Sequence, residues 1–124
     1  MPKSVYSDLA PEAIGPYSQA VISGGFVFVS GQLPFTPANE DLPETIEAEV
    51  HQSLTNIKHI LEACGSSLEK VVRVGIFLTN LADFGRANEV YASFFKKPYP
   101  ARVTVQVSAL PKGARVEIDA IAEV

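Results

Sequence analysis

The sequence predicts a single α+β domain with a mixed sheet and two helices on one face of that sheet. Three observations support this fold class. Apolar residues alternate with polar ones in short segments typical of strands, and they recur every three or four residues in two longer segments typical of helices. The order of these segments is β-β-α-β-α-β-β after a short extended arm. The length of 124 residues leaves no room for a second domain.

The first two strands are predicted at residues 19–22 and 26–30, which are rich in β-branched and aromatic residues. Ser23-Gly24-Gly25 lies between them, and paired glycines supply the positive φ angles of a tight hairpin turn. Several prolines mark the following segment, residues 31–43, as a loop.

Two helices are predicted at residues 44–64 and 81–95. In the first helix the apolar residues fall on one stripe. Gly65 follows this stripe and is expected to end the helix, because glycine readily adopts the left-handed conformation of a C-terminal cap. A similar stripe runs along the second helix, and Asn80 is expected to cap its N-terminus.

Three more strands are predicted at residues 71–79, 102–109 and 115–122. The two helices can cover only one face of the resulting sheet. The other face is expected to mix charged, polar and apolar residues: Arg102, Thr104, Gln106, Glu117, Asp119, Phe77, Val71 and one set from residues 26–29. Such a face is seldom left open to water, so we expect a homo-oligomer that buries it. A monomer with a half-exposed antiparallel sheet is the alternative.

Composition argues against several classes of protein. The formal net charge is −4 and the ten basic residues are scattered, whereas nucleic-acid binding needs a dense basic patch. The single cysteine, Cys64, excludes an intrachain disulfide. The N-terminus has no apolar core of a signal peptide, and no apolar segment reaches the ~20 residues of a membrane helix. We therefore expect a cytoplasmic protein, or a mitochondrial one if the source is a eukaryote.

The histidines and the cysteine are not expected to carry chemistry. His51 and His59 lie eight residues apart on the first helix, which excludes the i,i+4 pair of a metal site. Both are expected at the edge of the apolar stripe or in solvent. Cys64 falls on the stripe itself and is expected to fill the core, where a thiol is unreactive.

Arg102 and Glu117 are the clearest candidates for chemistry. If the last two strands pair as a hairpin, both side chains share the face opposite the helices. An arginine can hold a small carboxylate through two parallel hydrogen bonds, and a nearby glutamate can orient a water molecule. A cross-strand ion pair without a function is the alternative. Gly31, which follows a strand, indicates close approach by another group, with ordinary turn chemistry as its alternative.

Several segments together resemble the Rid (reactive intermediate deaminase) family, also called YjgF. They occur in order along nearly the whole chain, and the C-terminal motif is specific. The segments are Gly15-Pro16-Tyr17-Ser18-Gln19-Ala20, Phe28-Val29-Ser30-Gly31-Gln32-Leu33-Pro34, Asn56-Ile57, Phe84, Asn88-Glu89-Val90-Tyr91, Phe94-Phe95, Pro100-Ala101-Arg102-Val103-Thr104-Val105, Leu110-Pro111 and Val116-Glu117-Ile118.

The resemblance implies a chorismate-mutase-like fold and a homotrimer with active sites in clefts between subunits. It also implies an activity, the hydrolysis of 2-iminobutanoate and 2-iminopropanoate, or their enamine tautomers, to 2-keto acids and ammonia. Pyridoxal-phosphate dehydratases release these reactive intermediates. The deaminases of the family use no cofactor and no metal.

The resemblance also implies site residues, position by position. Arg102 matches the arginine that binds the substrate carboxylate, and Glu117 matches the glutamate that positions the attacking water. The other substrate-binding positions are Tyr17 in the cleft wall, the Gly31 carbonyl as acceptor for the imine nitrogen, and Asn88 and Thr104 at or near the pocket.

Val103 departs from the pattern, because many members of the family have serine there. By alternation Val103 is expected to point away from Arg102 and towards the helices, with little direct effect on catalysis. Two other functions remain open. One is a non-catalytic trimeric module that binds small carboxylates or acts like a chaperone. The other is an endoribonuclease or translation inhibitor, against which the acidic balance argues.

Overall fold

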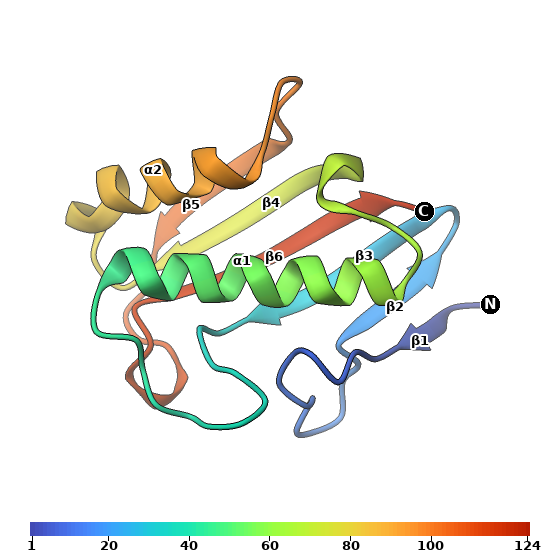
Figure 1. Ribbon diagram of the computed structural model, residues 1–124, viewed down its shortest axis with the longest axis horizontal. Helices are drawn as coiled ribbons and strands as arrows, with labels where there is room; N and C mark the ends of the chain where they lie inside the picture. Colours follow the sequence, from blue (N-terminus) through green and yellow to red (C-terminus); the bar gives the residue numbers. More distant parts are fainter.

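The computed structural model covers residues 1–124 and contains one six-stranded mixed sheet, with both long helices packed on the same face (Figure 1). The strand order is β1-β2-β3-β6-β4-β5. The elements are β1 (Lys3–Val5), β2 (Ala20–Ser23), β3 (Phe26–Gln32), α1 (Ile46–Ala63), β4 (Val71–Leu78), α2 (Phe84–Phe94), β5 (Ala101–Gln106) and β6 (Val116–Glu123), with short 3-10 helices η1 (Leu68–Lys70), η2 (Leu81–Asp83) and η3 (Pro111–Gly113). This arrangement confirms the predicted α+β fold.

The extended arm at the N-terminus is an edge strand. β1 pairs antiparallel with β2, and the buried Gln19 ties down the chain between them. Its side chain accepts a hydrogen bond from the Ser7 N–H at 2.6 Å and donates one to the Pro11 carbonyl at 2.8 Å. β2 then forms a hairpin with β3, in which Gly24 and Gly25 have φ angles of 61° and 83°. The predicted glycine turn is confirmed.

The first helix follows its prediction closely. The Thr45 side chain caps α1 by accepting a hydrogen bond from the Ala48 N–H at 3.1 Å, and Gly65 follows the helix with a φ angle of 78°. The second predicted helix is divided in two. Asn80 caps the 3-10 helix η2 by accepting from the Ala82 N–H, and α2 begins only at Phe84.

The two C-terminal strands do not form a hairpin. β4 lies between them, parallel to β5 and antiparallel to β6. The reason is the helical connection through α2, which returns the chain parallel to β4 at its outer edge. The segment after β5 then crosses β4 and places β6 next to β3. β6 therefore has neighbours on both sides, and its residues Val116 and Ile118 are completely buried.

This topology changes the faces on which the candidate residues lie. Arg102 pairs with Val74, which pairs with Ala120, and paired residues point to the same side of a sheet. Val74 and Ala120 are buried in the core under the helices, so Arg102 lies on the helix face. By the same register, Thr104 and Gln106 lie there as well. The expectation that these three residues share the open face with Glu117 is wrong.

The open face carries the alternate residues. Val105 pairs with Phe77, which pairs with Glu117, and all three lie opposite the helices. Val103 belongs to this face too, so the expectation that it points towards the helices is also wrong. Val71 is buried instead, because the register of β4 shifts between Val71 and Arg73. The mixture of apolar and charged side chains is as predicted.

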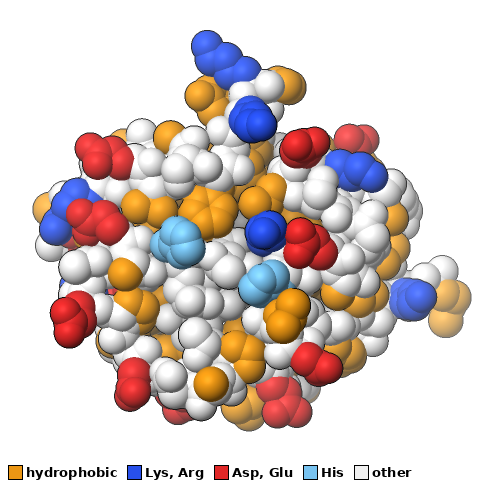
Figure 2. All heavy atoms as spheres, viewed as in Figure 1, with side chains coloured by type: hydrophobic (Ala, Val, Ile, Leu, Met, Phe, Trp, Pro, Cys, Tyr) orange, Lys and Arg blue, Asp and Glu red, His pale blue; other side chains and the backbone are white.

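Charges on the helix-bearing side of the molecule are interspersed, and no large basic patch appears there (Figure 2). The loop between α2 and β5, which includes Lys96 and Lys97, stands out from the body (Figure 1). Neither helix combines the length and the apolar composition that crossing a membrane would require.

Candidate active site

Glu117 lies on the open face of β6 with its carboxyl group against the backbone of β3. A Cβ atom added to Gly31 would lie 2.5 Å from Glu117 Oε2, much closer than unbonded atoms approach. Gly31 lies where the register of β3 against β6 shifts, between Val29 and Gln32. Any other residue at position 31 would displace the carboxyl group. The position of this glycine after a predicted strand indicated that another group approaches it closely, and that group is the Glu117 carboxyl.

A hollow of about 720 Å³ opens beside this contact. Its lining includes Gly31 and Tyr17, whose ring is about half exposed. Apolar side chains such as Leu33 and Phe35 form part of the wall, and Lys112 lies at the rim. The hollow can therefore offer a small polar ligand a backbone acceptor, a phenol and apolar contacts at once.

The environment of Glu117 favours its protonated form. Burial raises the pKa of this carboxyl above its ordinary value of 4.5, and the negative charge of Asp119 raises it further. Asp119 is two residues after Glu117 on β6, and its side chain lies on the same face of the sheet. Its Oδ1 atom lies 3.5 Å from Arg73 Nη1. A carboxyl with a raised pKa can take up and release a proton nearer to neutral pH than an ordinary glutamate can.

Helix α2 fixes the side chain of Arg102 on the other face of the sheet. The Nη1 atom donates a hydrogen bond to Asn88 Oδ1 at 2.7 Å. The guanidinium carbon lies 4.7 Å from the centre of the Tyr91 ring and 5.6 Å from that of Phe84. These contacts orient the guanidinium plane, and its other N–H groups make no hydrogen bond within the chain, which leaves them for an anion.

Two buried hydroxyl groups near Arg102 lack hydrogen-bond partners. Thr104 Oγ1 lies on the same face of β5 as Arg102, and Tyr91 contributes the ring that stacks on the guanidinium group. Burial raises the pKa of Tyr91, although the charge of Arg102 acts to lower it. Because a buried hydroxyl without a partner is unfavourable, these atoms are suited to a water molecule or a ligand beside Arg102.

The candidate residues thus form two separate groups within one chain. Tyr17 and Gly31 line the hollow, and the Glu117 carboxyl lies against Gly31. Arg102 and Asn88 are in contact beneath α2, with Thr104 on the same face. Arg102 on β5 and Glu117 on β6 lie on opposite faces of the sheet with β4 between their strands, so the alternative of a cross-strand Arg102–Glu117 ion pair is wrong.

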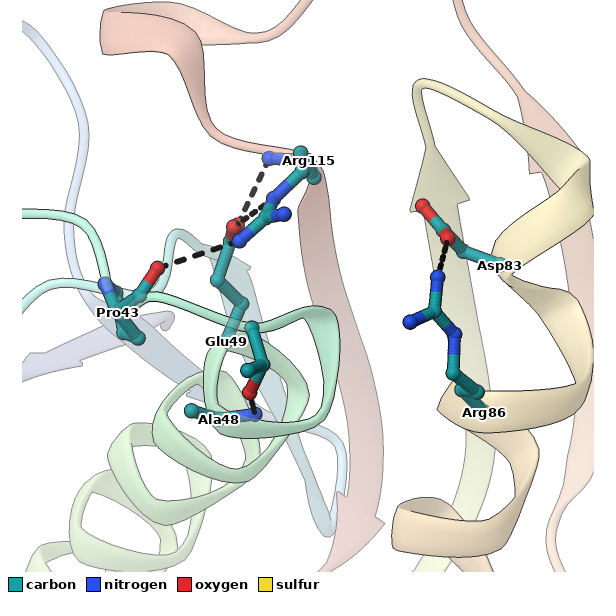
Figure 3. Close-up of polar contacts among 7 residues, drawn as sticks. Pro43, Ala48, Glu49, Asp83, Arg86 and Arg115 are labelled. Atoms are coloured by element: carbon teal, nitrogen blue, oxygen red, sulfur yellow. Dashed lines mark hydrogen bonds and ion pairs between the residues drawn. The ribbon is translucent and has the colours of Figure 1, made fainter.

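Sequence patterns did not reveal two polar clusters. One is Arg73 with Asp119, which lies over Gly75: a Cβ atom there would be 2.4 Å from Asp119 Oδ1. The other is completely buried Glu49 on α1, which accepts hydrogen bonds from the backbone N–H and the Nε of Arg115 (Figure 3). Glycine within a strand was a usable signal for the first cluster; a helical glutamate beside the apolar stripe gave none for the second.

The histidines and the cysteine lie as expected. His51 is exposed, with its ring edge against Phe94, and His59 is partly exposed with its Nδ1 atom 3.2 Å from the Leu9 carbonyl oxygen. Cys64 is buried in the core, where burial raises the pKa of its thiol. None of the three belongs to either group of candidate residues.

The fold and the site define a class of protein: an α+β fold with a carboxyl group held over a strand glycine that lines a ligand-sized hollow. The family model described as "Endoribonuclease L-PSP" matches residues 7–124. The chain belongs to this family, the Rid or YjgF family, as the sequence motifs indicated.

Relatives in the family carry different names. The chain is 51% identical over 123 residues to "Protein DfrA" of Myxococcus xanthus, with 97% of this chain and 94% of the relative covered. It is 46% identical over 121 residues to the 2-iminobutanoate/2-iminopropanoate deaminase of Bos taurus, with 97% and 88% covered. The crystal structure of Escherichia coli TdcF with bound serine superimposes with a TM-score of 0.93 at 42% identity, and 98% of each chain is covered.

Proposed function

We propose that this chain is a 2-iminobutanoate/2-iminopropanoate deaminase, a hydrolase that converts 2-imino acids to 2-keto acids and ammonia. The observation that carries the proposal is the Glu117 carboxyl, held against Gly31 beside the hollow with its pKa raised. The bovine relative named for this activity supports the choice of reaction. We expect the reaction to take place in the cytoplasm, or in the mitochondrion of a eukaryote.

Arg102 binds the carboxylate of the substrate in this proposal. Its free N–H groups form the two parallel hydrogen bonds that a planar carboxylate accepts, which contributes on the order of 1.5–3 kcal/mol. Asn88 and the aromatic rings hold the guanidinium plane in advance, so little side-chain freedom is lost on binding. Thr104 holds a water molecule or a substrate oxygen through its unpaired hydroxyl.

Glu117 orients the attacking water and transfers its proton in this proposal. It accepts a hydrogen bond from the water whose oxygen bonds to the imine carbon, and it takes the proton released in that step. The Gly31 carbonyl accepts a hydrogen bond from the imine nitrogen, and Tyr17 closes one side of the cleft. Glu117 then returns the proton to the nitrogen. As the C–N bond breaks, Glu117 accepts the second proton of the former water from the hydroxyl group, so the keto group forms. Ammonia leaves and takes up this proton as ammonium, with no cofactor in the scheme.

The separation of the two groups calls for a second copy of the chain in the active site. A three- or four-carbon substrate is too small to touch Arg102 on one face of the sheet and Glu117 on the other. The open face offers an apolar surface to a second copy, because Phe28, Val103 and Val105 are 45%, 40% and 39% exposed. In our proposal three copies close into a ring, and Arg102 of one chain meets Glu117 of the next.

A non-catalytic binding module is the second candidate. The favouring observation is the TdcF structure, whose ligand is serine, a small molecule with a carboxylate. The same cleft could hold a keto acid without turnover. A third candidate, an endoribonuclease or translation inhibitor, has the family model's description in its favour. The net charge of −4 and the interspersed charges of Figure 2 argue against it.

Trapping the imine tests the proposal. A threonine dehydratase generates 2-iminobutanoate in the presence of semicarbazide, and the rate of semicarbazone formation is followed with and without this protein. We expect the wild type to suppress trapping and Arg102→Ala to lose most of this effect. Ligand-detected binding of 2-ketobutanoate is measured in parallel. Binding without suppression would reject the deaminase in favour of the binding module.

A further inference from the structure

A second carboxylate lies next to Glu117 on the open face of the sheet. Asp119 is two residues farther along β6, and a strand rises about 3.3 Å per residue, which places the two Cα atoms roughly 6.6 Å apart on the same face. Each carboxyl group lies over a glycine: Glu117 over Gly31, and Asp119 over Gly75. The absence of two side chains thus creates space for two adjacent acidic groups.

Asp119 has a partner, whereas Glu117 has none within the chain. Arg73 lies on the adjacent strand β4, and its Nη1 atom is 3.5 Å from Asp119 Oδ1. A Cβ atom on Gly75 would lie 3.4 Å from the same Arg73 nitrogen. Both side chains of this pair are partly exposed, at 45% and 35%. The negative charge of Asp119 raises the pKa of the neighbouring Glu117 carboxyl.

No other charged group on the neighbouring strands faces Glu117. Glu117 pairs with Phe77 on β4, and Phe77 pairs in turn with Val105 on β5. On its other side, Glu117 lies against Gly31 of β3. The wall of the adjacent hollow carries four further titratable groups: Tyr17, Glu12, and Glu40 with Lys112, which form an ion pair. In the assembly proposed above, Arg102 of a second copy joins this set. Within the chain, the charge of Asp119 acts on Glu117 from this face, and Arg73 pairs with Asp119.

We propose that Asp119 and Arg73 are a pair of positioning residues that set the ionisation of Glu117: Asp119 keeps the carboxyl a competent proton acceptor near neutral pH, and Arg73 limits this effect. The inference deepens the proposed function and rests on it for its catalytic meaning. A general base works best when its pKa lies near the operating pH, so an adjacent fixed negative charge improves the base. Neither residue touches the substrate.

The two partners predict shifts of opposite sign. Asp119→Asn removes the negative charge and should lower the pKa of Glu117 by about 0.5–1 unit, the size expected for a partly screened charge at this distance. Arg73→Gln leaves Asp119 uncompensated and should raise it. The acid limb of the kcat/KM profile, where Glu117 must be ionised, should move in the same direction as each pKa.

Glu123→Gln is the matched control. It removes one negative charge from the same face of the same strand, but six residues away, or roughly 20 Å. This distance exceeds the Debye length of about 10 Å in ordinary salt, so the pKa of Glu117 should stay unchanged. Thermal unfolding of all variants identifies any loss of structure.

The pKa of Glu117 is measured directly by NMR titration of chains with ¹³C-labelled glutamate carboxyl groups, with the signal assigned through Glu117→Gln. Opposite shifts in Asp119→Asn and Arg73→Gln, with none in Glu123→Gln, support the inference. They do so even if imine trapping shows no activity, in which case the proposed function alone fails. Active protein with an unchanged Glu117 titration in Asp119→Asn overturns the inference and leaves the function intact.

Discussion

Gly31 matters at the scale of a single residue because the atom it lacks is replaced by a carboxylate oxygen of Glu117. Gly31→Ala should place a Cβ atom 2.5 Å from that oxygen and force the carboxyl group away. We expect a loss of most of the deaminase activity and a destabilisation of about 1–3 kcal/mol, typical of overpacking. Imine trapping and urea unfolding measure the two effects.

Gly85→Ala serves as the control for this change. Gly85 lies in helix α2 and has open space where a Cβ atom would lie, so alanine should fit there. We expect a stabilisation of about 0.5–1 kcal/mol from the higher helix propensity of alanine, with activity unchanged. Equal losses of activity in both variants would show that Gly31 has no special relation to Glu117.

Glu117→Gln should abolish turnover and yet stabilise the protein at neutral pH. Because the pKa of Glu117 is raised in the folded state, the folded protein binds its proton more tightly than the unfolded chain does. The contribution of this group to stability is therefore greatest below the ordinary value of 4.5, and it falls as pH rises through the raised folded pKa. Glutamine has a similar shape without the charge and avoids this loss.

Thermal unfolding between about pH 4 and pH 8 measures the effect. The wild type should lose stability relative to Glu117→Gln as pH rises across this window. If the variant is less stable than the wild type at neutral pH, the ionised carboxyl has stabilising contacts that outweigh its burial.

Single residues were predictable where the sequence carries a motif or a backbone constraint. Gly31 after a predicted strand indicated close approach, and that approach is the Glu117 contact, although β3 extends through Gly31 to Gln32. The Arg73–Asp119 pair was not predictable, because it depends on the register of β4 against β6, which alternation alone does not define. The prediction that Val103 points towards the helices was wrong for the same reason. Only the register of β5 against β4 shows which alternate residues of this edge strand face the helices.

Glu49 and Arg115 act at the scale of elements, because they fasten the start of β6 to α1. Glu49 is completely buried, whereas the Arg115 side chain is 38% exposed and also donates to the Pro43 carbonyl at 3.2 Å (Figure 3). Arg115→Ala should leave a buried carboxylate short of its partner and cost about 3–5 kcal/mol. Glu49→Gln leaves a neutral acceptor and should cost only about 1–2 kcal/mol.

Chemical denaturation of the two variants decides this prediction, and Arg86→Ala provides a control. Arg86 pairs with Asp83 at 2.7 Å, but its side chain is 58% exposed, so its loss should cost no more than about 1 kcal/mol. Similar losses for Arg115→Ala and Arg86→Ala would mean that burial of Glu49 does not control the energetics of its pair.

Elements were easier to predict than their pairing. The periodic stripe of α1 and its stop at Gly65 come from local rules, and both are confirmed. The neighbours of β5 and β6 depend on long-range strand pairing. The same alternation of polar and apolar residues fits a β5–β6 hairpin and a sheet with β4 between these two strands. That pairing moved Arg102 to the helix face and separated it from Glu117.

Mixing two inactive variants tests the assembly at the scale of the whole molecule. In our proposal each active site takes Arg102 from one chain and Glu117 from the next. Arg102→Ala and Glu117→Gln chains, unfolded together and refolded in equal amounts, should then regain activity at about one quarter of the sites. Each variant refolded alone is the control. No recovery, despite mixed oligomers shown by mass spectrometry, would place both residues in a site made by one chain.

The molecule as a whole also shows why the oligomer could be expected from sequence but its geometry could not. The mixed composition of the open face was visible in the alternation of residues, and Phe28, Phe77 and Glu117 confirm that mixture. How copies meet depends on the shape of a curved surface, which no pattern of residues describes.

The place of β6 in the sheet has a consequence for folding during synthesis on the ribosome. β6 is the central bridge between β3 and β4, yet it is synthesised after every other strand. Until it has left the ribosome, β1-β2-β3 and β4-β5 are two half-sheets with no strand in common, and the core beneath α1 is open. The apolar surfaces of the two half-sheets must therefore stay apart until β6 has been made, and long-range pairing of β6 then completes the sheet.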